Sequence, residues 1–242
     1  MAQLKAAESF LAMHDRTNRD GPLVIPNVWD AGSARAYAEA GFPALATSSA
    51  AISASLGYED GGGTPADEMF AAIARIVRSV DVPVTADIEA GYGLAPQEIV
   101  ERLLETGAVG CNLEDSEPLT GEVKDAEEHA NWLAEVSVAA GDRIVLNARV
   151  DTFLYGDKSV ESAVRRARLY IEAGADVIFP ILAPVGLLPD IAECVSRPVN
   201  ALYLPGGTEP KVLGTLGAAR VTFGGTLYSR AMDSVLSMAR EL

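Results

Sequence analysis

The stretch Val84-Thr85-Ala86-Asp87-Ile88-Glu89-Ala90-Gly91-Tyr92-Gly93 is an apolar strand that ends in two carboxylates and a glycine-rich turn. Residues 110–115 and 144–151 repeat this arrangement, and an arginine stands between the polar residues of the second repeat. Three predicted strands therefore carry polar and charged side chains at their C-terminal ends. That pattern is typical of a barrel enzyme with a metal ion in its mouth.

The composition narrows the class of protein. The chain has 242 residues, 49% of them apolar, and a formal net charge of −15. Nucleic-acid binding requires a basic surface, so the acidic charge argues against such a partner. No apolar run approaches the ~20 residues of a membrane span, and the N-terminus has no signal-peptide core. We therefore expect a cytoplasmic protein without a membrane partner.

The cysteines and histidines carry little functional signal. Cys111 and Cys194 lack the paired spacing of a metal or redox site, so we expect two buried free thiols. His14 and His129 fall on predicted helices, and we expect both at the surface.

Strands and helices alternate along the whole chain. This alternation requires a parallel sheet with helices outside it. Eight such units in 242 residues predict one closed (β/α)₈ barrel domain over 1–242, with a doubly wound open sheet as the alternative. A long loop is expected at 50–64. The predicted strands are 23–28, 44–49, 82–89, 110–115, 143–151, 176–182, 198–204 and 220–223, and the predicted helices are 3–16, 33–40, 65–79, 96–106, 124–140, 159–173, 187–195, 208–216 and 226–241.

Alternation within the strands gives the direction of the polar side chains. Asp87 and Glu89 share one face of their strand, and the apolar residues share the face that must meet the helices. Glu114, Arg149 and Asp151 obey the same parity in the next two strands. These acids are therefore predicted to face the barrel axis, with Arg149 as the single inward base. Local helix capping or ion pairing is the alternative.

Crowded carboxylates either take up protons or bind a cation. An all-oxygen set suits a hard cation, with Mg²⁺ as the first choice and Mn²⁺ as the second. Arg149 offers a planar fork for a substrate carboxylate. Ser48, Ser49 and Ala50 offer N–H and hydroxyl groups to the same anion, although ordinary turn chemistry explains the serines as well. Together these groups predict a 2-oxo acid substrate and an enolate stabilised by the metal.

Several segments together resemble the isocitrate lyase/phosphoenolpyruvate mutase superfamily, from about residue 20 to the end of the chain. The resemblance implies an Mg²⁺-dependent (β/α)₈ barrel that makes or breaks C–C or P–C bonds through pyruvate-type enolates. It also implies a homo-oligomer, a dimer or more commonly a tetramer. The segments are 27–34, 47–50, 56–60, 87–93, 112–115 and 147–151, and 198–202 marks a loosely assigned branch of the family.

The resemblance assigns roles by position. It implies that Asp87 is the direct metal ligand, within a metal site that includes Glu89 and Glu114. Glu89, Glu114 and Asp60 would hold the waters of the metal. The residues expected to bind the substrate are Ser48, Ser49, Ala50, Arg149 and Asn200, and the residues expected to take part in the reaction are Asp60, Glu114 and Arg149. Three glycines after Asp60 indicate a mobile lid over 57–63.

The chain departs from the family in its chemistry-bearing loop. The lyases carry a Lys-Lys/Arg-Cys-Gly-His loop, and the mutases a longer gating loop, where this chain has residues 115–123 without cysteine, histidine or lysine. The C-terminal arm that swaps between neighbours in many members is expected to be short or absent, since the chain stops at Leu242. The leading hypothesis is an Mg²⁺-dependent C–C lyase or decarboxylase for a small 2-oxo or 2-hydroxy (di)carboxylic acid. The alternatives are P–C bond chemistry and a non-catalytic 2-oxo acid binder.

Overall fold

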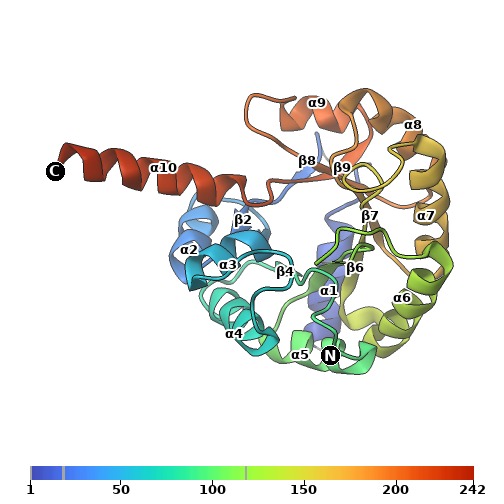
Figure 1. Cartoon of the computed structure of the whole chain (residues 1–242), viewed down its shortest axis with the longest axis horizontal. Coiled ribbons are helices and arrows are strands. Elements are labelled where there is room, and N and C mark those ends of the chain that lie inside the picture. The colour runs from blue at the N-terminus through green and yellow to red at the C-terminus, as the bar shows by residue number, and fades with distance from the viewer. Residues whose placement is uncertain (1, 18–19, 118) are drawn as a thin grey trace.

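A parallel β-sheet forms the centre of the molecule (Figure 1). The computed structural model describes residues 2–17, 20–117 and 119–242. Within them, all neighbouring strands pair in parallel, in the order β1-β9-β8-β7-β6-β5-β4-β3-β2. The strands are β1 (Leu23–Val24), β2 (Asn27–Val28), β3 (Leu45–Thr47), β4 (Val84–Asp87), β5 (Gly110–Leu113), β6 (Val145–Val150), β7 (Val177–Pro180), β8 (Val199–Leu202) and β9 (Ala218–Thr222).

The sheet closes into a barrel through its first strand, which is broken into two pieces. Only Ile25 and Pro26 separate β1 from β2, and Pro26 has no N–H to donate to a sheet. β1 pairs with β9 and β2 pairs with β3, so the two ends of the strand order are joined by the chain itself. The (β/α)₈ barrel is therefore confirmed, and the open-sheet alternative is wrong.

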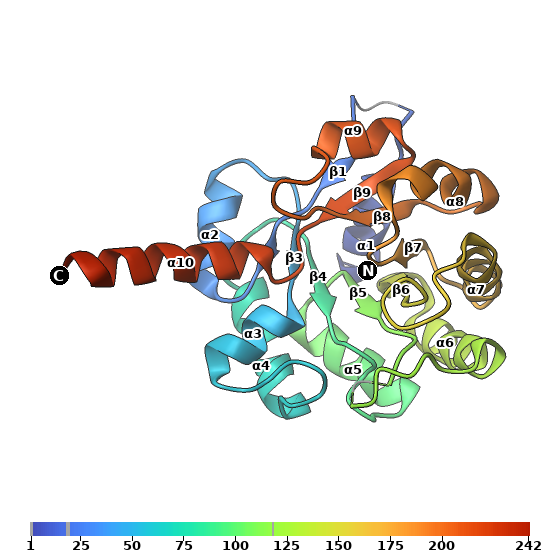
Figure 2. The ribbon, with the colours of Figure 1, turned by 45° about the horizontal axis from the view of Figure 1, so that its top comes forward.

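Helices surround the barrel (Figures 1 and 2). Their ends follow local signals: α5 begins at Pro96, and Gly107 ends it in the left-handed conformation with a φ of 81°. The helices are α1 (Ala2–Ala12), α2 (Ala31–Glu39), α3 (Ser49–Leu56), α4 (Ala66–Val77), α5 (Pro96–Thr106), α6 (Ala126–Ala140), α7 (Val160–Glu172), α8 (Leu188–Cys194), α9 (Pro210–Thr215) and α10 (Thr226–Glu241), with 3₁₀ turns at Gly141–Arg143 and Val185–Leu187.

The loop expected at 50–64 is wrong in its first half, which is helix α3. Ser48 caps this helix, because its hydroxyl accepts a hydrogen bond from the N–H of Ala51. Gly57 ends it with a φ of 88°. The helix is built of serine and alanine with few large apolar residues, so its periodicity is weak in the sequence. Its N-terminus points at the mouth of the barrel.

Helix α1 closes the N-terminal end of the barrel. Ala7 and Phe10 are buried in one cluster with strand residues such as Leu23, Val145 and Val177. Figure 2 shows α1 behind the ring of strands. Burying a phenylalanine side chain stabilises a fold by about 1.5–3 kcal/mol. The opposite end, where the strands terminate, is left for the site.

Three expectations for single side chains are wrong. His14 packs edge-on against Phe10, and His129 stacks on Trp132, so both histidines are buried rather than exposed. Cys111 is buried as expected, but Cys194 is exposed.

Helix α10 extends away from the barrel (Figures 1 and 2). None of its side chains is buried, and Met232, Val235, Leu236 and Met238 are exposed apolar residues. The helix expected at 226–241 is therefore confirmed, and the expectation of a short or absent swapping arm stays a prediction. Among the described residues, no helix has the length and apolar character needed to cross a membrane.

Candidate functional site

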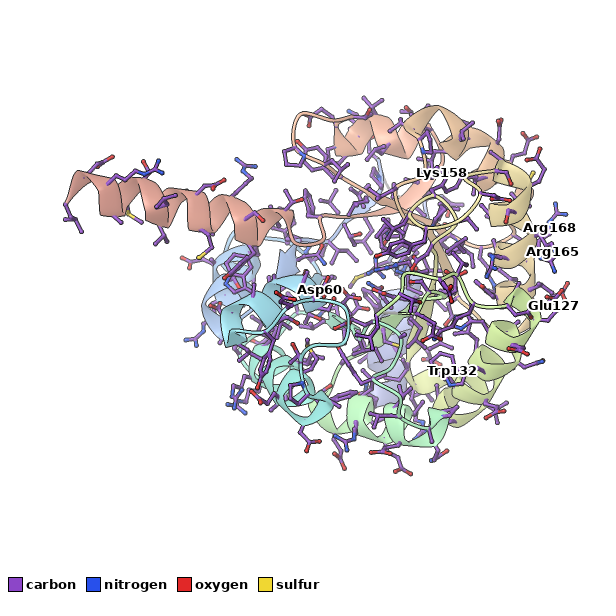
Figure 3. All side chains as sticks on the ribbon, in the orientation of Figure 1. Asp60, Glu127, Trp132, Lys158, Arg165 and Arg168 are labelled. Atoms are coloured by element: carbon purple, nitrogen blue, oxygen red, sulfur yellow. The ribbon has the colours of Figure 1, made fainter. Side chains whose placement is uncertain are left out.

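A cavity of about 230 Å³ opens at the C-terminal ends of the strands. It brings together six of the predicted site residues, among them Asp60 on the loop after α3 (Figure 3). The lining residues are Asn27, Ser48, Ser49, Ala50, Asp60, Asp87, Asn112, Arg149, Phe179, Ile181, Leu202, Leu204, Thr222, Phe223, Gly224, Gly225 and Thr226. Glu89 and Glu114 are buried and do not line this cavity; Glu89 lines a different cavity, together with Gly62 and Tyr92.

Asp87 ends strand β4 and is fixed by the neighbouring strand and helix. Its Oδ2 accepts hydrogen bonds from the N–H of Ser49 at 3.1 Å and from the hydroxyl of Ser49 at 2.9 Å. Its own N–H donates to the hydroxyl of Thr47. Its Oδ1 is buried and has no hydrogen-bond partner within the described part of the chain. A buried carboxylate oxygen without a donor is costly, so this atom points to a cation or an ordered water.

Glu89 lies beyond the end of β4, in a turn with unusual backbone geometry. Glu89 and Tyr92 both have positive φ values, 50° and 55°. Non-glycine residues in this conformation are strained, and such strain is concentrated at functional sites. The Glu89 carboxylate accepts a hydrogen bond from the N–H of Gly62, which joins this turn to the loop after α3. Burial, and then the charges of Asp60 and Asp87, raise the pKa of Glu89 to about 7.

Arg149 projects from β6 into a cage of carboxylates. Its Nε and Nη2 donate to the two oxygens of Asp151 at 2.6 and 3.0 Å, and its Nη1 donates to Glu114. Burial opposes the charge of Arg149, but Glu114 and Asp151 hold its pKa above the ordinary value. Burial also raises the pKa of Glu114 well above its ordinary value, and the charge of Arg149 offsets part of this effect. A guanidinium has five N–H donors, so two remain for a ligand.

The N-terminus of α3 supplies donors beside Asp87. The first N–H groups of a helix have no partner within the helix. In α3, the N–H of Ser49 goes to Asp87 and that of Ala51 goes to the hydroxyl of Ser48. The N–H of Ala50 lies between them, and Ala50 lines the cavity. Ser48 is therefore a helix cap, as the turn-chemistry alternative held, and Ser49 positions Asp87.

Asp60 brings a further carboxylate to the same cavity. Burial, and then the charge of Asp87, raise the pKa of Asp60. Although Asp60 is more exposed than the other acids, it is close enough to sense the charges of both Asp87 and Arg149. Asp60, Asp87 and Arg149 thus line one cavity, and the charges of Glu89 and Glu114 interact with that of Asp87.

This donor set fits a hydrated Mg²⁺ ion. Oδ1 of Asp87 and Oε1 of Glu89 are buried oxygens without hydrogen-bond partners among the described residues. In the same part of the chain, no three acidic, histidine or cysteine side chains converge closely enough to ligate one ion together. Mg²⁺ keeps several waters and uses one or two carboxylates directly. The arrangement therefore suits direct ligation by Asp87, with the other acids acting on bound water.

Asn200 does not reach the cavity wall. It is fully buried in β8, and its Nδ2 donates to the hydroxyl of Thr222 at 2.9 Å. Thr222 does line the cavity. Asn200 pairs with Arg220, one layer deeper in the barrel than Thr222, and its hydrogen bond orients the Thr222 hydroxyl. A direct role of Asn200 in substrate binding stays a prediction.

Two inward-facing residues, Asn27 and Arg220, were not identified as such from the sequence. Asn27 joins the ends of the barrel, because its Oδ1 accepts from the N–H groups of Phe223 and Gly224 and its Nδ2 donates to the carbonyl of Thr47. Arg220 is fully buried inside the barrel, where its Nη2 approaches Asn112.

The prediction that Arg149 is the single inward-facing base is therefore wrong, because Arg220 also faces the inside of the barrel. Burial lowers the pKa of Arg220 to about 9, and the nearby charge of Asp87 partly restores it. A signal for Arg220 was present in the sequence. Side chains alternate along a strand, so Arg220 shares a face with Thr222, which lines the cavity.

Comparisons with known proteins agree with this geometry. Residues 10–242 match the family described as phosphoenolpyruvate phosphomutase. The chain is 33% identical to the uncharacterized protein Rv1998c of Mycobacterium tuberculosis, over 95% of this chain and 88% of the relative.

Two solved structures extend the comparison. A putative phosphonomutase from Burkholderia cenocepacia J2315 superposes with a TM-score of 0.90 at 37% identity, over 98% of this chain and 99% of that one. A 2,3-dimethylmalate lyase superposes with a TM-score of 0.86 at 26% identity, over 98% of this chain and 84% of that one. With its barrel, its carboxylate-rich mouth and a match over nearly its whole length, the chain belongs to the phosphoenolpyruvate mutase/isocitrate lyase superfamily, whose members are lyases, mutases and hydrolases of small carboxylic acids.

Proposed function

We propose that the protein is an Mg²⁺-dependent lyase or decarboxylase for a small 2-oxo or 2-hydroxy (di)carboxylic acid, acting through a pyruvate-type enolate. The observation that carries the proposal is the buried Oδ1 of Asp87, which has no hydrogen-bond partner in the described ranges of the chain and lies beside Ser49 in a cavity that Arg149 also lines. When bound there, Mg²⁺ supplies a Lewis acid that stabilises negative charge on an enolate oxygen.

Different residues of the site have different roles in this proposal. Asp87 and the acids around it hold the metal and its waters. The two free N–H donors of Arg149 and the N–H of Ala50 bind the substrate carboxylate. Asp60 stands on the glycine-rich loop that reaches Glu89 through Gly62, so closure of that loop would exclude water and bring the Asp60 carboxylate to the reacting group.

The loop after β5 offers no acid of the kind the characterised lyases use. In its described part, Ser116 and Val123 form an antiparallel bridge, and the N–H of Glu117 donates to the carbonyl of Glu122. This short hairpin replaces the longer catalytic loop. The proton donor of the reaction is therefore expected among the residues that line the cavity at the barrel mouth. Asp60 is the first of these residues to test.

The proposal is tested by turnover of oxaloacetate, 2-methylisocitrate, phosphonopyruvate and a broad panel of 2-oxo and 2-hydroxy monocarboxylic acids with Mg²⁺. Release of a pyruvate-type product from a C–C substrate, abolished by EDTA and by Asp60→Asn, is the expected result. Turnover of phosphonopyruvate alone would instead favour P–C chemistry, the second candidate, which the family description and the putative phosphonomutase support. Metal-dependent binding across a broad panel without turnover would favour a non-catalytic binder.

We also propose that the protein is a homo-oligomer, a dimer or tetramer. Helix α10 stands off the barrel with Met232, Val235 and Leu236 exposed on it, and such a surface is costly in water unless a second chain covers it. Sedimentation velocity at micromolar concentration tests this, and a monomer would contradict it. The cytoplasmic location and the choice between Mg²⁺ and Mn²⁺ stay predictions.

A further inference from the structure

The wall of the cavity that lies across from Asp87 is apolar. Asp87 stands on β4, and the strand order places β8 on the opposite side of the barrel. That side is formed by Phe179 in β7 and Ile181 after it, Leu202 at the end of β8 and Leu204 after it, and Phe223 after β9. A ligand held by its carboxylate at the metal side would therefore extend over an aliphatic and aromatic surface.

The described residues of this wall include no second cation that could pair with another anionic group. Among the described residues that line the cavity, Arg149 is the only cation, and Glu114 and Asp151 already occupy three of its N–H donors. The N–H groups of Phe223 and Gly224 both donate to Asn27. A second carboxylate or a phosphonate placed against Ile181, Leu202 and Leu204 would be desolvated without a cation to pair with it, which is unfavourable.

The apolar wall also has room behind it. A second cavity of about 230 Å³ shares Leu202 and Leu204 with the first. Leu182, Val185, Leu188 and Leu213 form much of its remaining surface. Leu204 is 46% exposed, on the segment between β8 and α9, so its side chain stands at the border of the two cavities.

We propose that the site selects a 2-oxo or 2-hydroxy monocarboxylic acid with an aliphatic substituent, which packs against Ile181, Leu202 and Leu204. The inference rests on the proposed function, which assigns the binding of the substrate carboxylate. It adds that the opposite end of the substrate is an aliphatic group. Leu204 is then a specificity-determining residue. It favours an alkyl chain because contact with this wall removes apolar surface from water.

Two ligands of equal chain length separate the possibilities. 4-Methyl-2-oxopentanoate and 2-oxoglutarate share the 2-oxo acid head and differ in an isopropyl group against a terminal CH₂-carboxylate. Isothermal titration with excess Mg²⁺ should give a Kd at least tenfold lower for the branched acid. Pyruvate and oxalate serve as probes of the head alone.

A charged variant makes the test specific. Leu204→Arg should remove the preference or reverse it toward 2-oxoglutarate, since it places a cation on the apolar wall. Val212→Arg is the matched control, because Val212 is also 46% exposed, lies on α9 and lines neither cavity. It should keep the preference of the unmodified protein.

The outcomes distinguish the two proposals. Equal affinities, or tighter binding of 2-oxoglutarate to the unmodified protein, would overturn the apolar selectivity and leave the proposed function standing. An unchanged preference in Leu204→Arg would also overturn the role of this wall. If pyruvate, oxalate and both longer acids all fail to bind with Mg²⁺, the proposed function itself is wrong.

Discussion

Ser49 donates both its backbone N–H and its hydroxyl to one oxygen of Asp87, and the other oxygen has no hydrogen-bond partner among the described residues. The contact joins the first turn of α3 to the end of β4. It fixes the orientation of the carboxylate before any ligand arrives, and preorganised charge of this kind is what electrostatic catalysis requires.

Ser49→Ala should weaken Mg²⁺ binding about tenfold or more, because a hydrogen bond to a charged group contributes about 1.5–3 kcal/mol. Isothermal titration with Mg²⁺ measures the effect. Ser55→Ala on the same helix is the control, since its hydroxyl donates to the carbonyl of Ile52 away from the metal side. Equal losses in both variants would mean that Ser49 acts only through the stability of α3.

Arg149→Lys should reduce the affinity for oxalate by at least tenfold, because a lysine cannot keep the two-pronged contact with Asp151 and also face the ligand. The variant also leaves Glu114 and Asp151 poorly paired, so the free energy of unfolding should fall. Breaking a buried pair costs about 3–5 kcal/mol, and a lysine that retains the charge should cost less. Urea denaturation and ligand titration check the two effects separately, and unchanged oxalate binding would remove Arg149 from the site.

Gly91→Ala should destabilise the turn after Asp87. Gly91 has a φ of 85°, and an added Cβ would lie 2.6 Å from Cδ1 of Ile99. Gly93→Ala is the matched control, since its φ is 70° and no described atom comes within 4 Å of the added Cβ. Both variants carry the backbone cost of about 1–2 kcal/mol for a left-handed residue. Urea denaturation should show a further loss in Gly91→Ala alone, and equal losses would contradict the close packing.

His129 should make stability depend on pH. Burial, and then the charges of Lys124 and Arg166, lower its pKa in the folded protein to about 3, whereas the unfolded value is 6.5. Below pH 6.5 the unfolded chain binds a proton that the folded chain refuses, so stability falls as the pH drops from 6.5 toward 3. The slope from this residue approaches about 1.4 kcal/mol per pH unit.

His129→Phe retains the ring between Trp132 and Tyr170 but cannot be protonated. The difference in unfolding free energy between the two proteins should grow steadily from pH 6.5 to pH 5 in favour of the variant. A constant difference across this range would mean that His129 is accessible to protons in the folded state.

The barrel could be predicted because its signals are local. Gly107 and Pro96 mark helix ends, and the alternation around Asp87 fixes the direction of the strand. Helix α3 was missed, because serine and alanine provide no apolar stripe. Arg220 was missed because a lone arginine in a short strand resembles a surface residue until the register is known.

Contacts between residues far apart in the chain could not be predicted from the sequence. The sequence placed Glu114, Arg149 and Asp151 on the inner face, but not the bonds that tie Arg149 to both acids. The layer to which Asn200 belongs depends on the stagger between β8 and β9, where the register shifts at Val199 and Asn200. Alternation gives the direction of a side chain, whereas its depth in the barrel requires the three-dimensional structure.

The central claim is that Asp87 binds the metal that activates a 2-oxo acid. Titration of Mg²⁺ in the presence of oxalate compares the unmodified protein with Asp87→Asn, which keeps the shape of the side chain and removes its charge. Asp67→Asn on α4, in a surface pair with Arg102, controls for the loss of one negative charge. The structure predicts saturable binding in the unmodified protein and in Asp67→Asn, and a loss of at least a hundredfold in Asp87→Asn. An unchanged Kd in Asp87→Asn would contradict the claim.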